Sequence, residues 1–197
     1  MFAKALLFTT ATLLLLSVPH LTYSQNQFTG VDLSIEHVSG NVYMVQRPGG
    51  GGNIGAMVGP EGVLLVDSLF APLSDKLVAA VQQVSDADIR FLINTHIHID
   101  HIGGNQHLAE MGVLIFASDN TRHRFLEQRN RFPRNGGTFV PPQSESARPV
   151  VTFNDRLSFH LNGEEVQAFL VPPAHTDGDI FVYFPQSDVL HLGDVYP

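Results

Sequence analysis

Short apolar runs separated by turn residues dominate residues 33–67. Their β-branched and apolar side chains predict three strands, at residues 41–47, 53–58 and 62–67. Glycine-rich or Pro-Glu-Gly breaks stand between the runs. The four glycines at 49–52 cannot form a regular element, so they predict a loop with an unusually free backbone. This loop is either a flap over a site or a plain turn.

The pattern then changes to a helical one. Pro72 suits the first turn of a helix, and apolar residues recur after it at spacings of four, four and three. These residues are Leu73, Leu77, Val81 and Val84. They predict an amphipathic helix with one buried face.

Strands and helices alternate in the middle of the chain. Apolar runs predict buried strands at residues 89–94 and 113–117, and helices are predicted at 105–111 and 120–128. This alternation predicts an α/β fold, with a sheet layered by helices.

The second half of the chain predicts strands but no helix. Residues 130–149, rich in Arg, Gly and Pro, predict a long functional or mobile loop. Asn162-Gly163 predicts a tight hairpin between strands at 156–161 and 164–171. Two further strands are predicted, at 180–184 and 189–192. Because one face of these strands lacks a covering layer, we expect the sequence to be truncated at its C-terminus.

Composition limits the possible partners. The 197 residues suffice for one globular domain, and the net charge of -8 argues against nucleic acid or an anionic membrane surface as the main partner. There is no cysteine, so neither a disulfide nor a thiolate ligand is available. Any metal must therefore be held by imidazole and carboxylate groups, and histidine is abundant, with ten in the chain.

Residues 1–24 resemble an export signal. Lys4 gives a positive start, residues 5–18 an apolar segment, and Thr22-Tyr23-Ser24 a small-residue cleavage pattern. The apolar run is shorter than the roughly 20 residues of a membrane anchor. We therefore expect cleavage after Ser24, a mature domain at 25–197 without stable membrane association, and a periplasmic or secreted location.

The motif THIHIDHIGG at residues 95–104 carries the chemistry. His96 and His98 are two apart, so in an extended segment they point the same way and can bind one ion. Asp100 continues that parity and His101 breaks it. The two glycines that follow allow a sharp turn, which lets Asp100 and His101 face a second ion. Histidines satisfied by hydrogen bonds in a core are the alternative, but burying four ionisable groups without an ion is costly.

This motif resembles the HxHxDH-GG signature of the metallo-β-lactamase superfamily at every position. The resemblance covers nearly all of the mature chain and implies an αββα sandwich, here with an incomplete second half. It implies that Asp67 orients the ligands without touching the metal. It also implies that His175 completes the first site with His96 and His98, and that Asp194 bridges to the second site.

Alone, His175 and Asp194 are ambiguous, because a solvated turn histidine and a strand-capping carboxylate would look the same. The superfamily's further second-site histidine is expected beyond Pro197. His191 is a possible substitute, but its place within a strand favours packing between layers. His20 belongs to the signal, and the remaining histidines are interpreted as surface or structural: His37, His107, His123 and His160.

The resemblance implies a zinc-dependent hydrolase with two zinc ions and a small-molecule substrate. Zinc lowers the pKa of its bound water to about 7, so hydroxide can attack a carbonyl carbon, with Asp100 as ligand and orienter of the nucleophile. Asp194 is similar to the bridging aspartate of glyoxalase II and lactonases, and Asp177 replaces the proline usual in the His-Thr-Pro-Gly pattern. The substrate is therefore an ester, thioester, lactone or β-lactam, and no substrate-binding residue is assigned.

Two other classes stay open. Persulfide dioxygenases bind a single iron with similar histidines, which would make the protein an oxidoreductase. Flavodiiron oxygen reductases are disfavoured because they carry Glu where this chain has His98. If residue 197 ends the protein, an inactive metal-binding fragment is the third possibility.

Five of the eleven basic residues lie between residues 121 and 134: Arg122, Arg124, Arg129, Arg131 and Arg134. Such a run is either a solvated face or an anion-attracting rim. If it is a rim, replacing Arg131 and Arg134 with alanine should raise the Michaelis constant for anionic substrates only. Steady-state kinetics on matched anionic and neutral substrates would test this, and an equal effect on both would exclude a rim.

Overall fold

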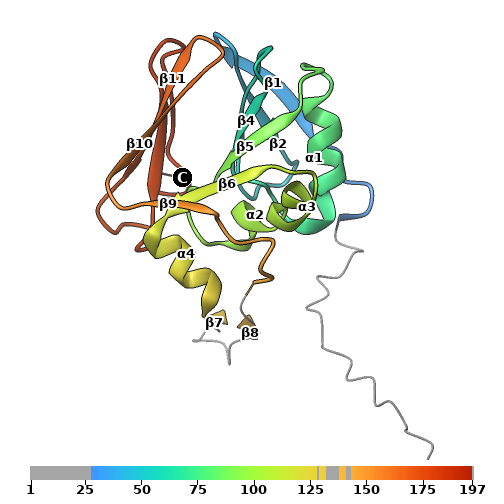
Figure 1. Ribbon diagram of the computed structural model, residues 1–197. Helices are drawn as coiled ribbons and strands as arrows, with labels where there is room; N and C mark the ends of the chain where they lie inside the picture. Colours follow the sequence, from blue (N-terminus) through green and yellow to red (C-terminus); the bar gives the residue numbers. More distant parts are fainter. Residues whose placement is uncertain (1–27, 128, 132–137, 141–142, 197) are drawn as a thin grey trace, which may run out of the picture.

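The computed structural model describes residues 28–127, 129–131, 138–140 and 143–196 (Figure 1). The expected signal and its cleavage site lie outside these residues. Within them, no helix has the length and apolar character needed to cross a membrane.

The larger of the two main sheets has seven strands in the order β1-β2-β3-β4-β5-β6-β9. Their bounds are β1 Ser34–Ser39, β2 Val42–Gln46, β3 Ile54–Met57, β4 Val63–Val66, β5 Ile89–Ile93, β6 Leu114–Ser118 and β9 Val151–Phe153. The first four strands pair antiparallel through short turns, whereas β4, β5, β6 and β9 run parallel because helices or long segments connect them. The predicted strands are confirmed to within one or two residues at their ends.

The helices of the described chain are short. They are a 3₁₀ turn at Ala71–Leu73, α1 Ser74–Val81, α2 Ile99–Ile102, α3 Asn105–Glu110 and α4 Asp119–Leu126. The predicted apolar stripe buries Leu73, Leu77 and Val81 completely or nearly so in the core between helices and sheet. Val84 lies beyond the end of α1 and is only half-buried.

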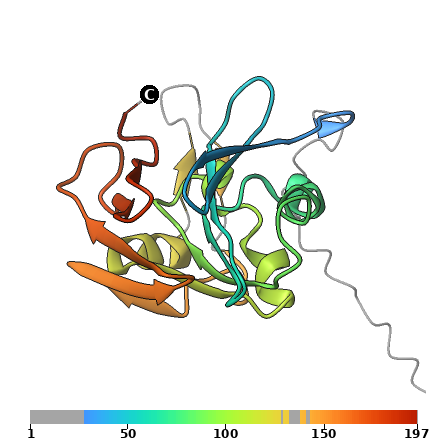
Figure 2. The same cartoon turned by 90° about the horizontal axis from the view of Figure 1, so that it is seen from above.

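The second sheet holds β10 Arg156–Leu161, β11 Glu164–Leu170, β12 Ile180–Phe184 and β13 Val189–His191, all antiparallel in sequence order. Alternate residues point into a core shared by the two sheets, among them Val166, Val182 and Phe184 opposite Val66 and Ile93. Seen from above, the second sheet and α1 lie on opposite sides of the first sheet (Figure 2). The layers are therefore helix, sheet and sheet, as expected for the α/β sandwich.

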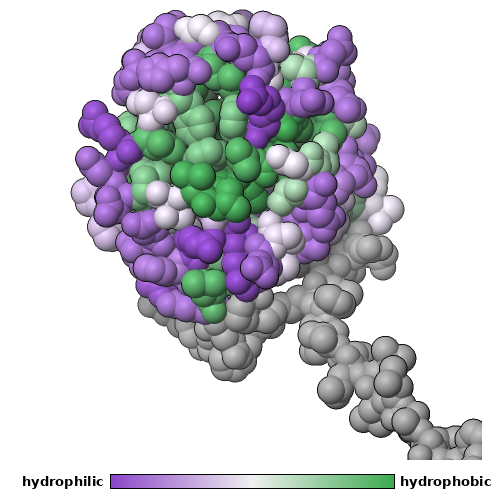
Figure 3. Space-filling model, in the orientation of Figure 1, coloured by the Kyte–Doolittle hydropathy of each residue, from purple (hydrophilic) through white to green (hydrophobic). Residues whose placement is uncertain are grey.

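One face of the molecule carries an apolar patch (Figure 3). Figure 3 shows hydrophobic residues gathered over the middle of this face, with hydrophilic residues around them. At the sandwich edge the rings of Phe91, Phe116 and Phe159 contact one another, with centroids 4.7–6.1 Å apart. These rings join the first sheet to the second by burying apolar area.

The prediction of a structureless loop at 130–149 was wrong in part. β7 Arg129–Arg131 and β8 Thr138–Val140 pair antiparallel as a small separate sheet. The sequence also did not reveal β9, which follows this segment and pairs parallel to β6. Three-residue strands carry too few alternations to show a period, and their pairing is decided by the neighbouring strand.

The predicted hairpin turn is confirmed and has a second role. Asn162 and Gly163 have φ of 55° and 75°, as a two-residue turn with left-handed residues requires. The Asn162 side chain also accepts a hydrogen bond from the Glu61 backbone N–H (2.9 Å) and donates one to the Gly62 carbonyl (2.7 Å). One residue thus shapes the turn and ties the second sheet to the β3–β4 turn of the first.

Asn162→Gly separates these two roles. Glycine suits the left-handed turn at least as well, but it loses both hydrogen bonds, so the free energy of unfolding should fall by about 1–2 kcal/mol. Asp188→Gly is a matched control, because Asp188 is exposed and also has a positive φ, of 51°. Urea denaturation should show little change for the control. An unchanged stability for Asn162→Gly would mean that only the turn matters.

Candidate metal centre

The candidate ligands meet at the carboxyl ends of β4, β5 and β13. Asp67 follows β4, and His96 and His98 follow β5. His175 lies between β11 and β12, and Asp194 follows β13. Both sheets therefore contribute to one site, although 98 residues separate the first of these histidines from Asp194.

The local conformation of the motif differs from the expected one. His98 is the last extended residue (φ -72°, ψ 150°), and α2 begins at Ile99. Asp100 therefore does not continue the extended parity, and that expectation was wrong. The single helical turn, rather than the glycine pair, brings Asp100 and His101 round beside the other histidines.

The two glycines serve close packing instead. Gly103 follows α2 with φ -61° and Gly104 has φ -80°, values open to any residue. A Cβ on Gly104 would lie 2.4 Å from the Ser68 carbonyl oxygen, and one on Gly103 would lie 2.7 Å from that of Leu69. Only glycine lets α2 and α3 approach the backbone that follows β4 so closely.

Three imidazole nitrogens converge at the first group. His98 Nδ1 lies 3.1 Å from His96 Nε2 and 2.9 Å from His175 Nε2. A ring nitrogen has one hydrogen or one lone pair in its plane, so His98 Nδ1 cannot satisfy both neighbours by hydrogen bonding. Zinc–nitrogen bonds of about 2.0–2.1 Å place tetrahedral ligand nitrogens about 3.3 Å apart, so these spacings suit one shared cation. Asp194 Oδ2 approaches the group, 3.6 Å from His175 Nε2.

A buried carboxylate fixes the direction of His96. Asp67 is fully buried and accepts hydrogen bonds from the backbone N–H and the hydroxyl of Thr95, both at 2.7 Å. Since the Thr95 hydroxyl donates its only hydrogen to Asp67, it accepts from His96 Nδ1, 3.0 Å away. His96 Nε2 then presents its lone pair to the other imidazoles.

Burial and neighbouring charges favour the neutral form of His96 and His98, which is the state that binds metal. Burial, together with repulsion from His101, lowers the pKa of His96 to about 3. Burial and the neighbouring His175 likewise lower the pKa of His98.

Asp67 also holds His101, the centre of the second group. His101 Nδ1 donates to Asp67 Oδ2 at 2.7 Å, so Nε2 faces Asp194 Oδ1 (3.2 Å) and Asp100 Oδ2 (3.9 Å). Burial opposes a charge on His101, yet attraction to Asp67 and Asp194 outweighs it and raises the pKa of His101 to about 10. Burial alone would raise the pKa of Asp67, but attraction to His101 more than offsets this and lowers it.

The second group also fits a cation. His101 Nε2 is buried and has no well-directed hydrogen-bond partner among the described residues, although Asp194 is near. A buried nitrogen aimed at two carboxylates is the donor set expected around a divalent ion. The ligand atoms of each group lie within 4.8 Å of one another: His96, His98, His175 and Asp194 in one, Asp100, His101 and Asp194 in the other.

The structure reveals a positioning residue for His175 that sequence reasoning missed. Asp179 is 2% exposed and accepts hydrogen bonds from the backbone N–H groups of His175 and Thr176, both at 2.8 Å. Its carboxylate also accepts from the Thr176 hydroxyl. The signal was present in the sequence, because an aspartate four residues after the histidine can close a turn on its own backbone.

Helix α4 and its N-cap residue Ser118 form hydrogen bonds with the same turn. Ser118 and Thr121 donate to the Gly178 carbonyl, and Arg124 donates two hydrogen bonds to the Asp177 carboxylate. Hydrogen bonding to Arg124 lowers the pKa of Asp177. Asp177, which stands where the related pattern has proline, is therefore paired with Arg124 in this chain.

The structure describes part of the predicted arginine run and the whole glycine loop. Arg122 donates to the Pro149 carbonyl and Arg124 is paired, so these two arginines serve the fold. The side chains of Arg129, Arg131 and Arg134 lie outside the described part. Gly52 of the glycine loop (residues 49–52) touches the second group, since a Cβ there would lie 3.0 Å from the Asp100 carbonyl oxygen and 3.2 Å from the His101 ring.

The remaining histidines lie apart from the two groups. His37, His107, His123 and His160 lie at or near the surface, and His37 and His107 contact the Gly40 carbonyl and Asp75. His20 lies outside the described residues. His191 uses both ring nitrogens on backbone groups, Asn53 and Gly193, so it is not a substitute ligand.

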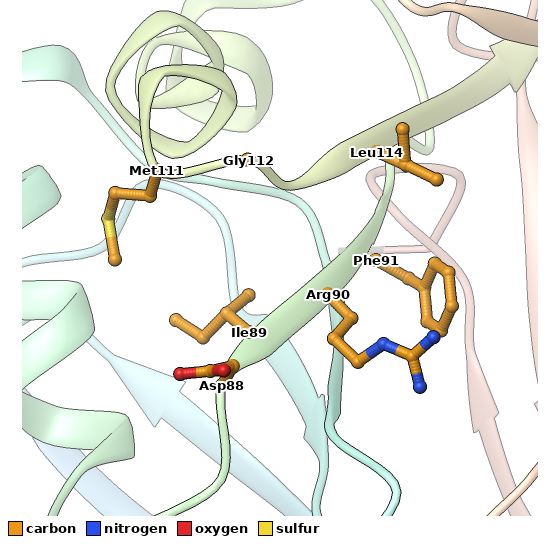
Figure 4. A pocket seen from close by; sticks show the side chains of 7 residues that line it. All are labelled: Asp88, Ile89, Arg90, Phe91, Met111, Gly112 and Leu114. Carbon is orange, nitrogen blue, oxygen red and sulfur yellow. The ribbon is translucent and has the colours of Figure 1, made fainter.

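A separate pocket of about 310 Å³ lies at the opposite ends of β5 and β6. Arg90 and Phe91 line one side of it, and Met111 and Ile89 lie on the other (Figure 4). The Arg90 side chain stacks on Phe91 and donates to the Glu61 carbonyl. None of its seven lining residues belongs to the ligand groups, so we do not connect this pocket with the candidate chemistry.

Comparison with known proteins agrees with this fold. The sequence model of the metallo-beta-lactamase superfamily matches residues 47–196, so the chain belongs to that superfamily. Among curated proteins it is 27% identical over 168 residues to a linear primary-alkylsulfatase of Pseudomonas sp. (69% of this chain, 32% of the relative). It is 26% identical over 144 residues to a hydroxyacylglutathione hydrolase of Nostoc punctiforme (73% and 44%) and 25% over 134 residues to the metallo-beta-lactamase type 2 of Bacillus cereus (68% and 46%).

Solved structures show the same fold. A metallo-beta-lactamase from Legionella gormanii superposes with a TM-score of 0.64 at 20% identity, covering 78% of this chain and 58% of that one. One from Pontibacter korlensis gives 0.60 at 20% identity, covering 79% and 68%. The chain spans about a third to a half of the length of the curated relatives named above.

The Arg124–Asp177 pair should couple weakly. Both side chains are about 40% exposed, so a double-mutant cycle with Arg124→Met and Asp177→Asn should give a coupling of about 1 kcal/mol or less in the free energy of unfolding. Since salt screens such pairs, the coupling measured by urea denaturation should shrink in 1 M NaCl. The Arg124–Glu127 pair on the same helix serves as comparison, and a coupling insensitive to salt would contradict an ionic origin.

Proposed function

We propose that the protein is a zinc-dependent hydrolase with two cation sites. The observation that carries this proposal is the convergence of three imidazole nitrogens. His98 Nδ1 lies 3.1 Å from His96 Nε2 and 2.9 Å from His175 Nε2. The buried Nε2 of His101, which faces Asp194 and Asp100 without a well-directed hydrogen bond among the described residues, supports a second site beside the first. His96, His98 and His175 would hold one ion, Asp100 and His101 the other, and Asp194 would bridge them.

When bound, zinc would supply a water nucleophile at neutral pH and polarise a carbonyl oxygen. Residues of this chain would orient the histidine rings and the attacking water. Asp67 holds the His101 ring and, through Thr95, the His96 ring, so that Nε2 of each ring faces the site. The Asp100 side chain is a quarter exposed, so its carboxylate can orient the attacking water and accept its proton.

The substrate class we propose is an ester, thioester, lactone or β-lactam. The absence of cysteine sets the chain apart from members with a cysteine ligand. Two relatives are named for hydrolysis of hydroxyacylglutathione and for β-lactamase activity, which supports acyl transfer to water. The alkylsulfatase relative makes sulfate esters a second candidate.

We also propose that the protein acts on a small molecule after export to the periplasm or beyond. The leader pattern of residues 1–24 supports export, and the net charge of -8 argues against a nucleic-acid partner. Residues 25–197 would then form the domain that carries the site.

Metal analysis tests the proposed sites. The chain loaded with zinc and then dialysed should retain two zinc ions, and His98→Ala should retain one or fewer, because its ring nitrogen contacts both neighbours in the first group. His37→Ala is the matched control, since His37 is exposed and lies outside both groups. Elemental analysis by mass spectrometry gives the count, and equal zinc in both variants would contradict the assignment.

The same preparation should hydrolyse at least one member of a panel of lactam, lactone, thioester and alkyl sulfate substrates. A chelator should abolish the activity, and Asp100→Asn should lower kcat by about 10²–10⁴-fold, as expected for loss of a proton acceptor. A single iron with sulfur-oxidising activity would overturn the proposal. Zinc uptake without hydrolysis of any substrate would favour an inactive metal-binding fragment.

A further inference from the structure

His191 is a half-buried histidine whose two ring nitrogens both contact backbone groups. Nδ1 lies 3.2 Å from the Gly193 nitrogen, and Nε2 lies 2.9 Å from the Asn53 carbonyl oxygen. The Gly193 N–H can only donate, so Nδ1 is the acceptor, and the ring hydrogen is on Nε2, which donates to Asn53. Both nitrogens are therefore used in one neutral tautomer, and burial correspondingly lowers the pKa of His191.

The contact with the Asn53 carbonyl anchors the glycine loop. Asn53 follows Gly52, the residue that packs against the Asp100 carbonyl and the His101 ring. The four glycines have φ between 49° and 92°, a region that costs glycine little, so the loop backbone has little intrinsic stiffness. The Asn53 carbonyl, held by His191, fixes the end of the loop nearest the second group.

The contact with the Gly193 N–H anchors the turn that carries Asp194. Gly193 has φ 55°, and a Cβ there would lie 3.0 Å from both Cβ and Oγ1 of Thr95. The turn is therefore pressed against the residue that links Asp67 to His96. Its backbone N–H is satisfied by His191, one residue before the carboxylate that faces His101 Nε2 at 3.2 Å.

We infer that His191 is a positioning residue that ties the glycine loop to the Asp194 turn, so that both keep their places on the two sides of His101. β3 supports the ring itself, because a Cβ on Gly55 would lie 3.2 Å from His191 Cδ2. The consequence for cation binding rests on the proposed function, whereas the tie between the two segments does not.

Two conservative substitutions each keep one half of the tie. In His191→Asn, the amide oxygen can take the place of Nδ1 and accept from Gly193. In His191→Gln, the amide nitrogen can take the place of Nε2 and donate to the Asn53 carbonyl. His191→Ala removes both contacts, and His160→Ala, an exposed histidine of β10, is the control.

Amide hydrogen exchange followed by NMR on the metal-free chain reads the two halves separately. His191→Gln should speed exchange at Gly193 by about tenfold and leave Gly50, whose N–H donates to the Arg47 carbonyl within the loop, within about threefold. His191→Asn should do the reverse. If both variants speed both sites alike, in proportion to their loss of global stability, His191 is only a packing residue and the inference is overturned.

Cobalt titration of the same variants tests whether the tie affects cation binding at the second group. His191→Gln should weaken uptake at the second group by about 10–100-fold, the usual effect of removing a partner that orients a ligand, while His191→Asn should stay within about threefold of wild type. Equal affinity in both variants would contradict the role in placing Asp194. If the wild-type chain takes up no second cobalt ion, the proposed function fails, and the exchange pattern alone still decides whether His191 ties the two segments.

Discussion

A fully buried carboxylate, that of Asp67, is the constraint on which the rest of the site depends. It follows β4 with φ 69°, an unusual conformation for a residue other than glycine, and accepts from the Thr95 backbone, the Thr95 hydroxyl and His101 Nδ1. A buried charge without such partners would cost several kcal/mol, so these three contacts are obligatory rather than incidental. They fix the loop after β5, the start of the Asp100–His101 turn and the ring orientations of His96 and His101 at once.

The second sheet then completes what the first prepares. Its inner face buries Val166, Val182 and Phe184 against the first sheet, and this packing sets how close the loops at its end come to the histidines. Asp179 and helix α4 hold the His175 turn, while His191 and Gly193 hold the Asp194 turn. His175 and Asp194 lie on irregular backbone, but their turns are held by Asp179 and His191. This preorganisation lets a partly exposed group such as Asp194 keep a defined position.

Membership of the metallo-beta-lactamase superfamily accounts for the fold and the ligand groups, and it leaves the substrate open. The relatives named above differ in the reactions that their names describe, and a shared fold does not choose among them. Three features of this chain hold the segments around the two groups: the Arg124–Asp177 pair at the His175 turn, the four-glycine loop against His101, and the His191 tie. They position backbone near the candidate ligands and do not supply ligand atoms themselves.

Features that depend on near neighbours in the chain could be predicted from the sequence. Periodicity located α1 and most strands, Asn162-Gly163 predicted its hairpin, and the spacing of His96, His98, Asp100 and His101 predicted a cluster at the end of β5. The structure was needed to show that α2 begins at Ile99, that β9 pairs with β6, and that Arg124 and His191 hold distant turns in place. These outcomes depend on hydrogen bonds and packing between residues up to 138 positions apart, and no local pattern in the chain encodes which partner will be near.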